Sequence, residues 1–86
     1  MDFEKLVANE TARKILNEIA EQRRLTFRDL AERSKVEPAI VQRILEDLTS
    51  QKLIAEENSP IHAFTQYYVT ADGLATNRHL QRAFRR

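Results

Sequence analysis

Residues 25–54 read LTFRDLAERSKVEPAIVQRILEDLTSQKLI, and this stretch predicts two helices joined by a tight turn. Thr26 has the short hydroxyl side chain of a helix N-cap, and Asp29, three residues later, can complete a capping box. Leu25 and Leu30 stand at the two positions of a hydrophobic staple, which fixes the angle at which the chain enters a helix. We therefore expect a short helix to begin directly after Thr26.

A second helix is predicted after the turn SKVEP. The residue before a proline is disfavoured in the helical conformation, so the first helix ends before Pro38. Pro38 itself suits the first position of the next helix, where its missing N–H would have no partner. The apolar residues then recur with a helical period, at Val41, Ile44, Leu45 and Leu48. Two helices joined by about four residues form a helix-turn-helix.

The residues before this stretch predict a further helix over residues 9–24. Asn9 is a candidate N-cap, and Glu10 in the first turn favours the positive end of the helix. The core stripe of this helix is expected to be Ala12, Ile15, Leu16, Ile19 and Ala20. Residues 1–8 hold enough apolar side chains for a short helical turn packed on another element.

The residues after the helix-turn-helix predict a β-hairpin over residues 53–70, with its loop at residues 58–63. Thr70 is a candidate N-cap for a last helix over residues 71–86, which carries a basic tail. Lys52, just after the second helix of the pair, stands where helices commonly end in a glycine with a left-handed backbone. Either Lys52 adopts that conformation and is strained by about 1–2 kcal/mol, or the helix ends by another geometry.

The whole pattern resembles the winged helix-turn-helix of small bacterial and archaeal repressors of the multiple-antibiotic-resistance (MarR) and arsenical-resistance (ArsR) types. The run NETARKILNEIAEQ resembles their first core helix, and QYYVTADGLATNRHL resembles their second wing strand and the next helix. The resemblance implies an α+β, mainly helical fold in one domain of residues 1–86. Its parts are a three-helix core with the helix-turn-helix at residues 26–51, a two-stranded β wing and a C-terminal helix.

The composition and the absence of certain motifs argue against several other classes of protein. The chain has no cysteine, so thiolate metal sites are excluded, and the soft-metal sensing of arsenical repressors is not implied. We expect no cofactor. No apolar run approaches the ~20 residues of a membrane span, and no signal-peptide pattern opens the chain, so we expect a cytoplasmic protein. No nucleophile–base pair or glycine-rich phosphate loop appears, so we do not expect an enzyme.

The net charge of +1 conceals an uneven distribution. Residues 55–72 carry a net charge of −3 and residues 73–86 carry +4, whereas residues 1–54 are neutral. A nucleic-acid-binding protein usually shows a clear basic stripe. Here the sequence shows a basic tail and a neutral helix-turn-helix.

The resemblance implies a set of DNA-binding residues. The second helix of the pair would enter the major groove, where Gln pairs with adenine and Arg with guanine. Phosphate contacts would come from the first helix and the turn, and His62 is the one candidate at the wing tip. The residues so implied are Pro38, Ala39, Gln42 and Arg43 at base edges, and Arg28, Arg33, Lys35 and His62 elsewhere on the DNA.

Some residues depart from the repressor pattern. Glu37 would lie near phosphates and repel them, and Glu46 and Asp47 can neutralise Arg43 within its own helix. Gln42 and Arg43 could then belong to a solvated helix face.

Two functions remain open from the sequence. One is a transcriptional regulator that binds double-stranded DNA as a homodimer through its N- and C-terminal helices. The other is a winged-helix module that binds a protein through the wing, where Ile61, Phe64 and Tyr68 are apolar, or through the Ile40 side of the second helix.

Overall fold

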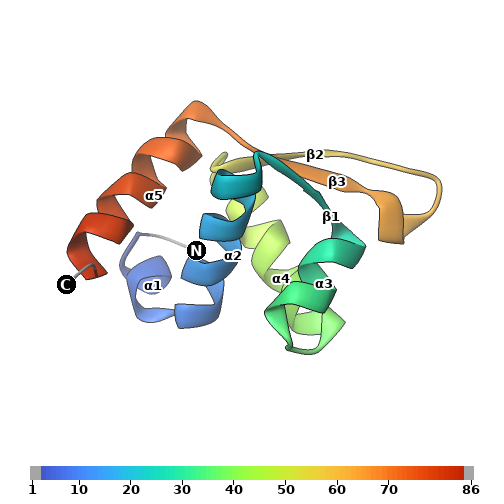
Figure 1. Ribbon diagram of the computed structural model, residues 1–86, viewed down its shortest axis with the longest axis horizontal. Helices are drawn as coiled ribbons and strands as arrows, with labels where there is room; N and C mark the ends of the chain where they lie inside the picture. The colour runs from blue at the N-terminus through green and yellow to red at the C-terminus, as the bar shows by residue number, and fades with distance from the viewer. Residues whose placement is uncertain (1–2, 85–86) are drawn as a thin grey trace.

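The computed structural model describes residues 3–84, and Figure 1 shows α2 at the centre, with α5 on one side and the helix-turn-helix on the other. Within this described range, no helix is long and apolar enough to cross a membrane. The elements follow the order α1 (Phe3–Ala8), α2 (Glu10–Gln22), β1 (Arg24–Thr26), α3 (Phe27–Ser34), α4 (Pro38–Ser50), β2 (Ile54–Glu57), the 3-10 turn η1 (His62–Phe64), β3 (Gln66–Val69) and α5 (Ala71–Phe84).

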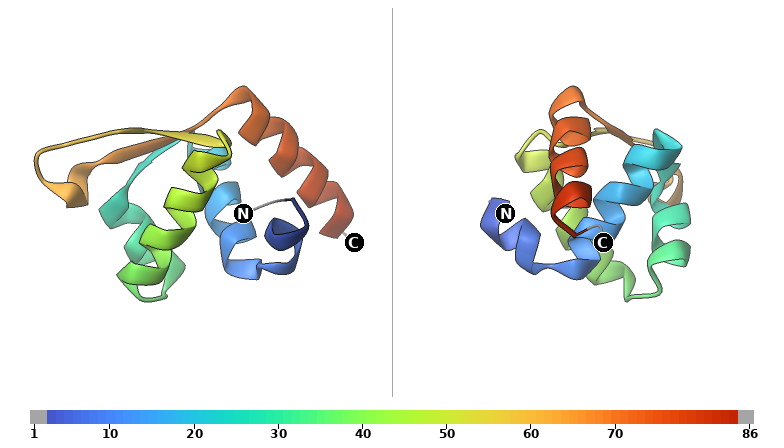
Figure 2. Two further views of the ribbon diagram at one scale, coloured as in Figure 1. Left: turned by 180° about the vertical axis from the view of Figure 1, so that it is seen from behind. Right: turned by 60° about the vertical axis from the view of Figure 1, so that its left-hand side comes forward.

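The core joins the apolar stripes of α2 and α4, as the helical periods predict. Every residue of both stripes is buried, and the residues that pack with them come from all parts of the chain: Leu6, Leu25, Leu30, Leu53, Ile54, Tyr67 and Leu80. Figure 2 shows α4 beside α2, with the β2–β3 hairpin (the wing) running past α4. The core therefore fixes α4 from behind and leaves its opposite face exposed.

The predicted N-caps of α2 and α3 are confirmed by their hydrogen bonds. The Ala12 N–H donates to Asn9 Oδ1 at 3.0 Å, which caps α2. Thr26 and Asp29 form the full capping box of α3, with N–H to side-chain oxygen distances of 3.1 and 3.2 Å. Leu25 is buried with the rest of the core, so the entry into α3 is fixed by both devices.

The sheet differs from the two-stranded wing that the sequence predicts. It has three antiparallel strands in the order β1-β3-β2, because Arg24–Thr26 pair with the outer edge of β3. The helix predicted over residues 9–24 accordingly ends at Gln22, and Arg23 turns the chain with a φ of 71°. Three residues are too few to show an alternating pattern, so only the pairing with β3, some 40 residues later, defines this strand.

The turn after α4 is a Schellman motif built on lysine. The Lys52 N–H donates to Thr49 O at 2.9 Å, and the Leu53 N–H donates to Leu48 O at 3.1 Å. Lys52 holds a left-handed φ of 62°, which is the first of the two alternatives that the sequence leaves open. A side chain makes this conformation costly, whereas glycine adopts it readily.

Replacing Lys52 by glycine is expected to stabilise the fold by about 0.5–1 kcal/mol, since relief of backbone strain exceeds the added entropy of the unfolded chain. Thermal unfolding followed by circular dichroism measures the effect. Gln51→Gly is the matched control, because Gln51 has a φ of −91° and glycine there brings only the entropic cost. Equal losses of stability in Lys52→Gly and Gln51→Gly would contradict a strained backbone at Lys52.

The junction between the wing and α5 is tightly packed. Thr70 caps α5 as predicted, since its Oγ1 accepts from the Gly73 N–H at 3.0 Å. The same hydroxyl lies 2.7 Å from Lys52 O and 2.9 Å from Leu53 O, and it can donate to either. Gly73 is buried here, against the chain entering β2. Arg85 and Arg86 of the predicted basic tail lie outside the described residues.

Candidate nucleic-acid interface

The exposed face of α4 carries most of the residues that the sequence assigns to base contacts. Pro38, Ala39 and Arg43 are exposed, and Gln42 is half-buried beside them. Asp47 and Glu46 follow one turn later, yet Arg43 forms no ion pair with either of them in the described structure. The guanidinium of Arg43 is therefore not neutralised within α4, although the sequence allows it.

The wing folds back onto the helix-turn-helix. His62 Nε2 lies 2.8 Å from Gln42 Oε1, and the imidazole ring packs on Phe27 with its centroid 4.5 Å from that of the phenyl ring. The Phe27 N–H also donates to Thr65 O at 2.9 Å. These contacts bring the wing tip beside α4, so the wing and the helix present one continuous surface. The sequence predicts both elements but not this contact between them.

The candidate phosphate contacts lie on or next to α3, and the structure pairs two of them. Arg28 Nε lies 3.3 Å from Glu32 Oε1 one turn away, and an Arg33 N–H donates to Glu18 Oε2 at 2.9 Å. Lys35 follows α3 with a left-handed φ of 58° and is exposed. Exposed ion pairs are worth at most about 1 kcal/mol, so the arginines can exchange these carboxylates for phosphate.

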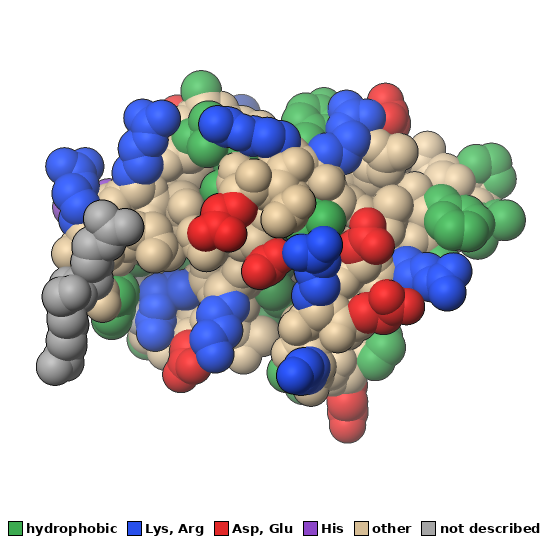
Figure 3. Space-filling model, viewed as in Figure 1, with side chains coloured by type: hydrophobic (Ala, Val, Ile, Leu, Met, Phe, Trp, Pro, Cys, Tyr) green, Lys and Arg blue, Asp and Glu red, His purple; other side chains and the backbone are tan. Residues whose placement is uncertain are grey.

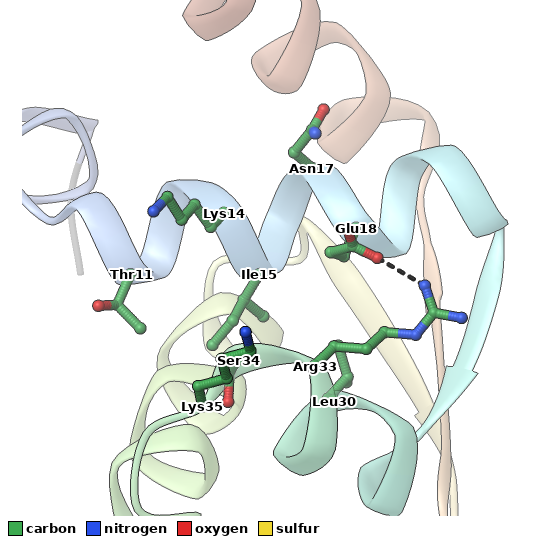
Figure 4. Close-up of a pocket in the computed structure, with 9 residues that line it drawn as sticks. All are labelled: Thr11, Lys14, Ile15, Asn17, Glu18, Leu30, Arg33, Ser34 and Lys35. Atoms are coloured by element: carbon green, nitrogen blue, oxygen red, sulfur yellow. Dashed lines mark hydrogen bonds and ion pairs between the residues drawn. The ribbon is translucent and has the colours of Figure 1, made fainter.

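A cleft of about 320 Å³ lies between α2 and α3, and the Arg33–Glu18 pair crosses from one helix to the other beside it (Figure 4). Its floor is apolar and its rim is charged. The lining residues are Thr11, Lys14, Ile15, Asn17, Glu18, Leu30, Arg33, Ser34 and Lys35. Two of the three candidate phosphate contacts thus share the rim of this cleft.

Strand β1 brings Arg24 to the sheet. The sequence does not assign this cation to the wing. Arg24 lies opposite Tyr68 in the register, with its guanidinium 5.2 Å from the ring centroid. It donates to Gln66 Oε1 at 2.8 Å and to Glu57 Oε2 at 3.3 Å. Hence the acidic side of the wing is partly neutralised. No local signal could have found this contact, because it depends on β1 pairing.

The wing tip is also apolar. Ile61 is 59% exposed and Phe64 is 47% exposed. Figure 3 shows hydrophobic side chains gathered at the end of the molecule where Figure 1 places the tip. This end of the wing is suited to contact with another molecule.

Tyr67 belongs to β3 of the wing, packs in the core and has an unusual hydroxyl. The residue is only 1% exposed, and its hydroxyl is buried without a hydrogen-bond partner in the described structure. Burial raises the pKa of Tyr67 to about 12, and the nearby carboxylates of Glu56 and Glu46 add to the effect. The phenol therefore stays neutral over a wide pH range.

The raised pKa of Tyr67 predicts a loss of stability at high pH. An unfolded tyrosine ionises near pH 10, so the folded state holds this proton more tightly between pH 10 and 12. The contribution is complete below pH 10 and falls by roughly 2 kcal/mol as the pH rises to 12. Thermal unfolding across this range should show a steeper decline for wild type than for Tyr67→Phe. Tyr68→Phe, at an exposed ring, serves as the control, and coinciding profiles for wild type and Tyr67→Phe would contradict the prediction.

Comparison with known proteins identifies the family. Residues 9–55, more than half of the chain, match the family described as winged helix-turn-helix DNA-binding. No protein of curated function matches the chain. The matched segment runs from the cap of α2 to the first residues of β2, so it contains the whole helix-turn-helix.

Several solved structures share the fold. A mutant of ZitR from Lactococcus lactis is 26% identical, with a TM-score of 0.71 over 83% of this chain and 49% of that chain. A mutant of MarR from E. coli, complexed with operator DNA, is 16% identical, with a TM-score of 0.76 over 93% of this chain and 61% of that chain. NadR in complex with 4-hydroxyphenylacetate is 20% identical, with a TM-score of 0.76 over 87% of this chain and 54% of that chain.

This chain thus spans about half of the length of the solved structures that it matches. The expected resemblance to MarR-type regulators is confirmed for the fold. The chain belongs to the winged helix-turn-helix DNA-binding family, and the solved structures that resemble it are regulators of the MarR type.

Proposed function

We propose that this chain is the DNA-binding part of a transcriptional regulator, with α4 in the major groove of double-stranded DNA. The proposal draws support from the family match and from the likeness to a MarR mutant complexed with operator DNA. Gln42 and Arg43 would read base edges, while the start of α4 at Pro38 and Ala39 fits close against them. Arg28, Arg33 and Lys35 would contact phosphates, and His62 would approach the backbone from the wing.

The observation that carries this proposal is the contact between Gln42 and His62. It places the wing tip beside the exposed face of α4, so that one continuous surface combines the helix proposed to enter the groove with the wing that flanks it. Arg43 stands exposed on the same helix without an ion pair in the described structure. A bidentate contact from such an arginine to guanine is the commonest specific contact in the major groove.

We also propose that the regulator acts as a homodimer through α1 and α5. Phe84 near the end of α5 is exposed, with the Arg13 guanidinium 4.1 Å from its ring centroid. Two copies related by a two-fold axis would read half-sites about one helical turn apart. Analytical ultracentrifugation at several protein concentrations tests the assembly, and a monomer at every concentration would exclude it.

Fluorescence anisotropy with random-sequence duplex DNA, across a series of salt concentrations, tests the DNA-binding function. Phosphate contacts release counterions, so the affinity should fall steeply with salt. A variant truncated after Gln81 loses the tail arginines and should bind more weakly with a smaller salt slope. Selection of bound duplexes from a random library then gives the preferred site. An absence of binding even at low salt would exclude the proposal.

A second candidate function is favoured by the exposed apolar tip of the wing. Ile61 and Phe64 there suit a protein contact better than a phosphate contact. This alternative predicts a stoichiometric complex that survives nuclease treatment and is lost in Ile61→Ser. Native mass spectrometry of complexes isolated from cell extract distinguishes it from the DNA-binding proposal.

A further inference from the structure

The first turn of α4 is both exposed and apolar. Pro38, Ala39 and Ile40 open the helix, and all three residues are exposed. Ile40 is 46% exposed, whereas the other large apolar residues of α4, from Val41 to Leu48, are at most 4% exposed. The core therefore takes the other large apolar side chains of α4 and leaves Ile40 facing outward.

Ile40 lies next to Arg43 on the surface of α4. Both residues line an open surface pocket of about 480 Å³ between α4 and the start of α2, and Ala39 belongs to the same wall. Ile40 and Arg43 are three positions apart, so the helix brings their side chains together on one face. Arg43 forms no ion pair within the described residues 3–84. The pocket thus presents an apolar side chain and a guanidinium side by side.

The chemistry of this first turn limits what it can recognise in DNA. The side chains of Pro38, Ala39 and Ile40 neither donate nor accept a hydrogen bond. The base edges in the major groove carry hydrogen-bonding atoms, and their apolar group is the C5-methyl of thymine. An isoleucine that covers this methyl group removes apolar surface of both partners from water, which is favourable. The first turn of α4 is therefore suited to thymine, whereas Gln42 and Arg43 suit the polar edges of neighbouring base pairs.

We propose that Ile40 selects thymine through its C5-methyl group, within two base pairs of the guanine that Arg43 reads. This inference rests on the proposed function, in which α4 enters the major groove. Three residues span about 4.5 Å along a helix axis, and base pairs stack about 3.4 Å apart, which sets the expected spacing. A protein could cover Ile40 instead, but the adjacent guanidinium and the DNA-binding family match favour DNA.

Replacement of thymine by deoxyuridine tests the contact, because deoxyuridine pairs as thymidine does and lacks only the C5-methyl group. The probe is the preferred duplex selected from the random library, with its thymines replaced one at a time, and fluorescence anisotropy gives the affinity. We expect one replacement near the guanine to weaken wild-type binding by about 3- to 5-fold, the effect of one buried methyl group. The same replacement should change the affinity of Ile40→Ala little, because alanine is too short to cover the methyl group.

Ile61→Ala is the matched control for Ile40→Ala. It makes the same substitution at another exposed isoleucine, which lies at the wing tip and outside α4. Its loss of affinity on replacement of the thymine should equal that of wild type. Ile40→Leu keeps a large apolar side chain and should retain most of that loss, which a purely structural role for Ile40 would not predict. Circular dichroism establishes that each variant is folded.

Two results would overturn the contact while DNA binding persists. One is a wild-type affinity that no replacement of a thymine changes. The other is an equal loss in wild type and Ile40→Ala, which would leave the Ile40 side of α4 as a surface for a protein. In both cases the proposed function stands and only the thymine contact is rejected. An absence of binding to any duplex at low salt would remove the proposed function, and this inference with it.

Discussion

Replacing Gly73 by alanine is expected to destabilise the fold by about 2 kcal/mol or more, and to lower the unfolding midpoint by roughly 8–16 °C. A Cβ at this position would lie 1.9 Å from the backbone oxygen of Leu53 and 2.9 Å from Val69 Cγ2. The Leu53 oxygen already lies 3.1 Å from the Thr70 N–H nitrogen and 2.9 Å from the Thr70 hydroxyl. Alanine must therefore push α5 away from the start of β2 and lengthen both contacts.

The direction of this effect makes the test decisive. In an open helix, alanine is favoured over glycine by about 1 kcal/mol, so helix propensity alone predicts a stabilisation. Thermal unfolding by circular dichroism measures the balance. Asp72→Ala, at the exposed neighbouring position, is the control and should change the stability by less than about 1 kcal/mol. A higher midpoint for Gly73→Ala would mean that α5 does not approach β2 as the structure describes.

Arg43→Ala is expected to weaken binding to the preferred DNA site by about 5- to 150-fold, which corresponds to about 1–3 kcal/mol for a lost contact to a guanine. The affinity for random-sequence DNA should fall only as far as the loss of one positive charge requires. The ratio of the two affinities should fall accordingly, because a base contact carries sequence information and a phosphate contact does not. Fluorescence anisotropy with both duplexes at one salt concentration gives this ratio.

Arg78→Ala is the matched control for Arg43→Ala. It removes the same charge from an exposed position on α5, and Figure 1 shows α5 on the side of α2 opposite the helix-turn-helix. Its effect should be nearly equal on the two duplexes and should leave the ratio unchanged. An unchanged ratio in Arg43→Ala as well would reject the proposed base contact and favour a solvated α4 face.

The helices and their buried faces could be predicted from the sequence because they depend on short separations. The capping box of Thr26 and Asp29 spans three residues, and the stripes of α2 and α4 repeat every three or four. The position of Lys52 after α4 is a local signal as well, but it left open whether the helix ends in a strained left-handed residue, as it does, or by another geometry. Hydrogen bonds and apolar periodicity act over the same few residues, so a single sequence displays them. These local signals predicted the helix-turn-helix and the face of α4 that stays exposed, whereas the winged-helix fold was expected from the resemblance to MarR- and ArsR-type repressors.

The features that join one element to another were decided only by the tertiary structure. Arg24 reaches Gln66 across 42 residues, and Gln42 meets His62 across 20 residues. The cavity that Gln42, Glu56 and Tyr67 help to line exists only because the wing lies beside α4. Such contacts depend on the path that the chain takes between their partners, and no periodic pattern encodes that path. The sequence alone therefore determined which residues face outward, and the tertiary structure decided which of them stand together.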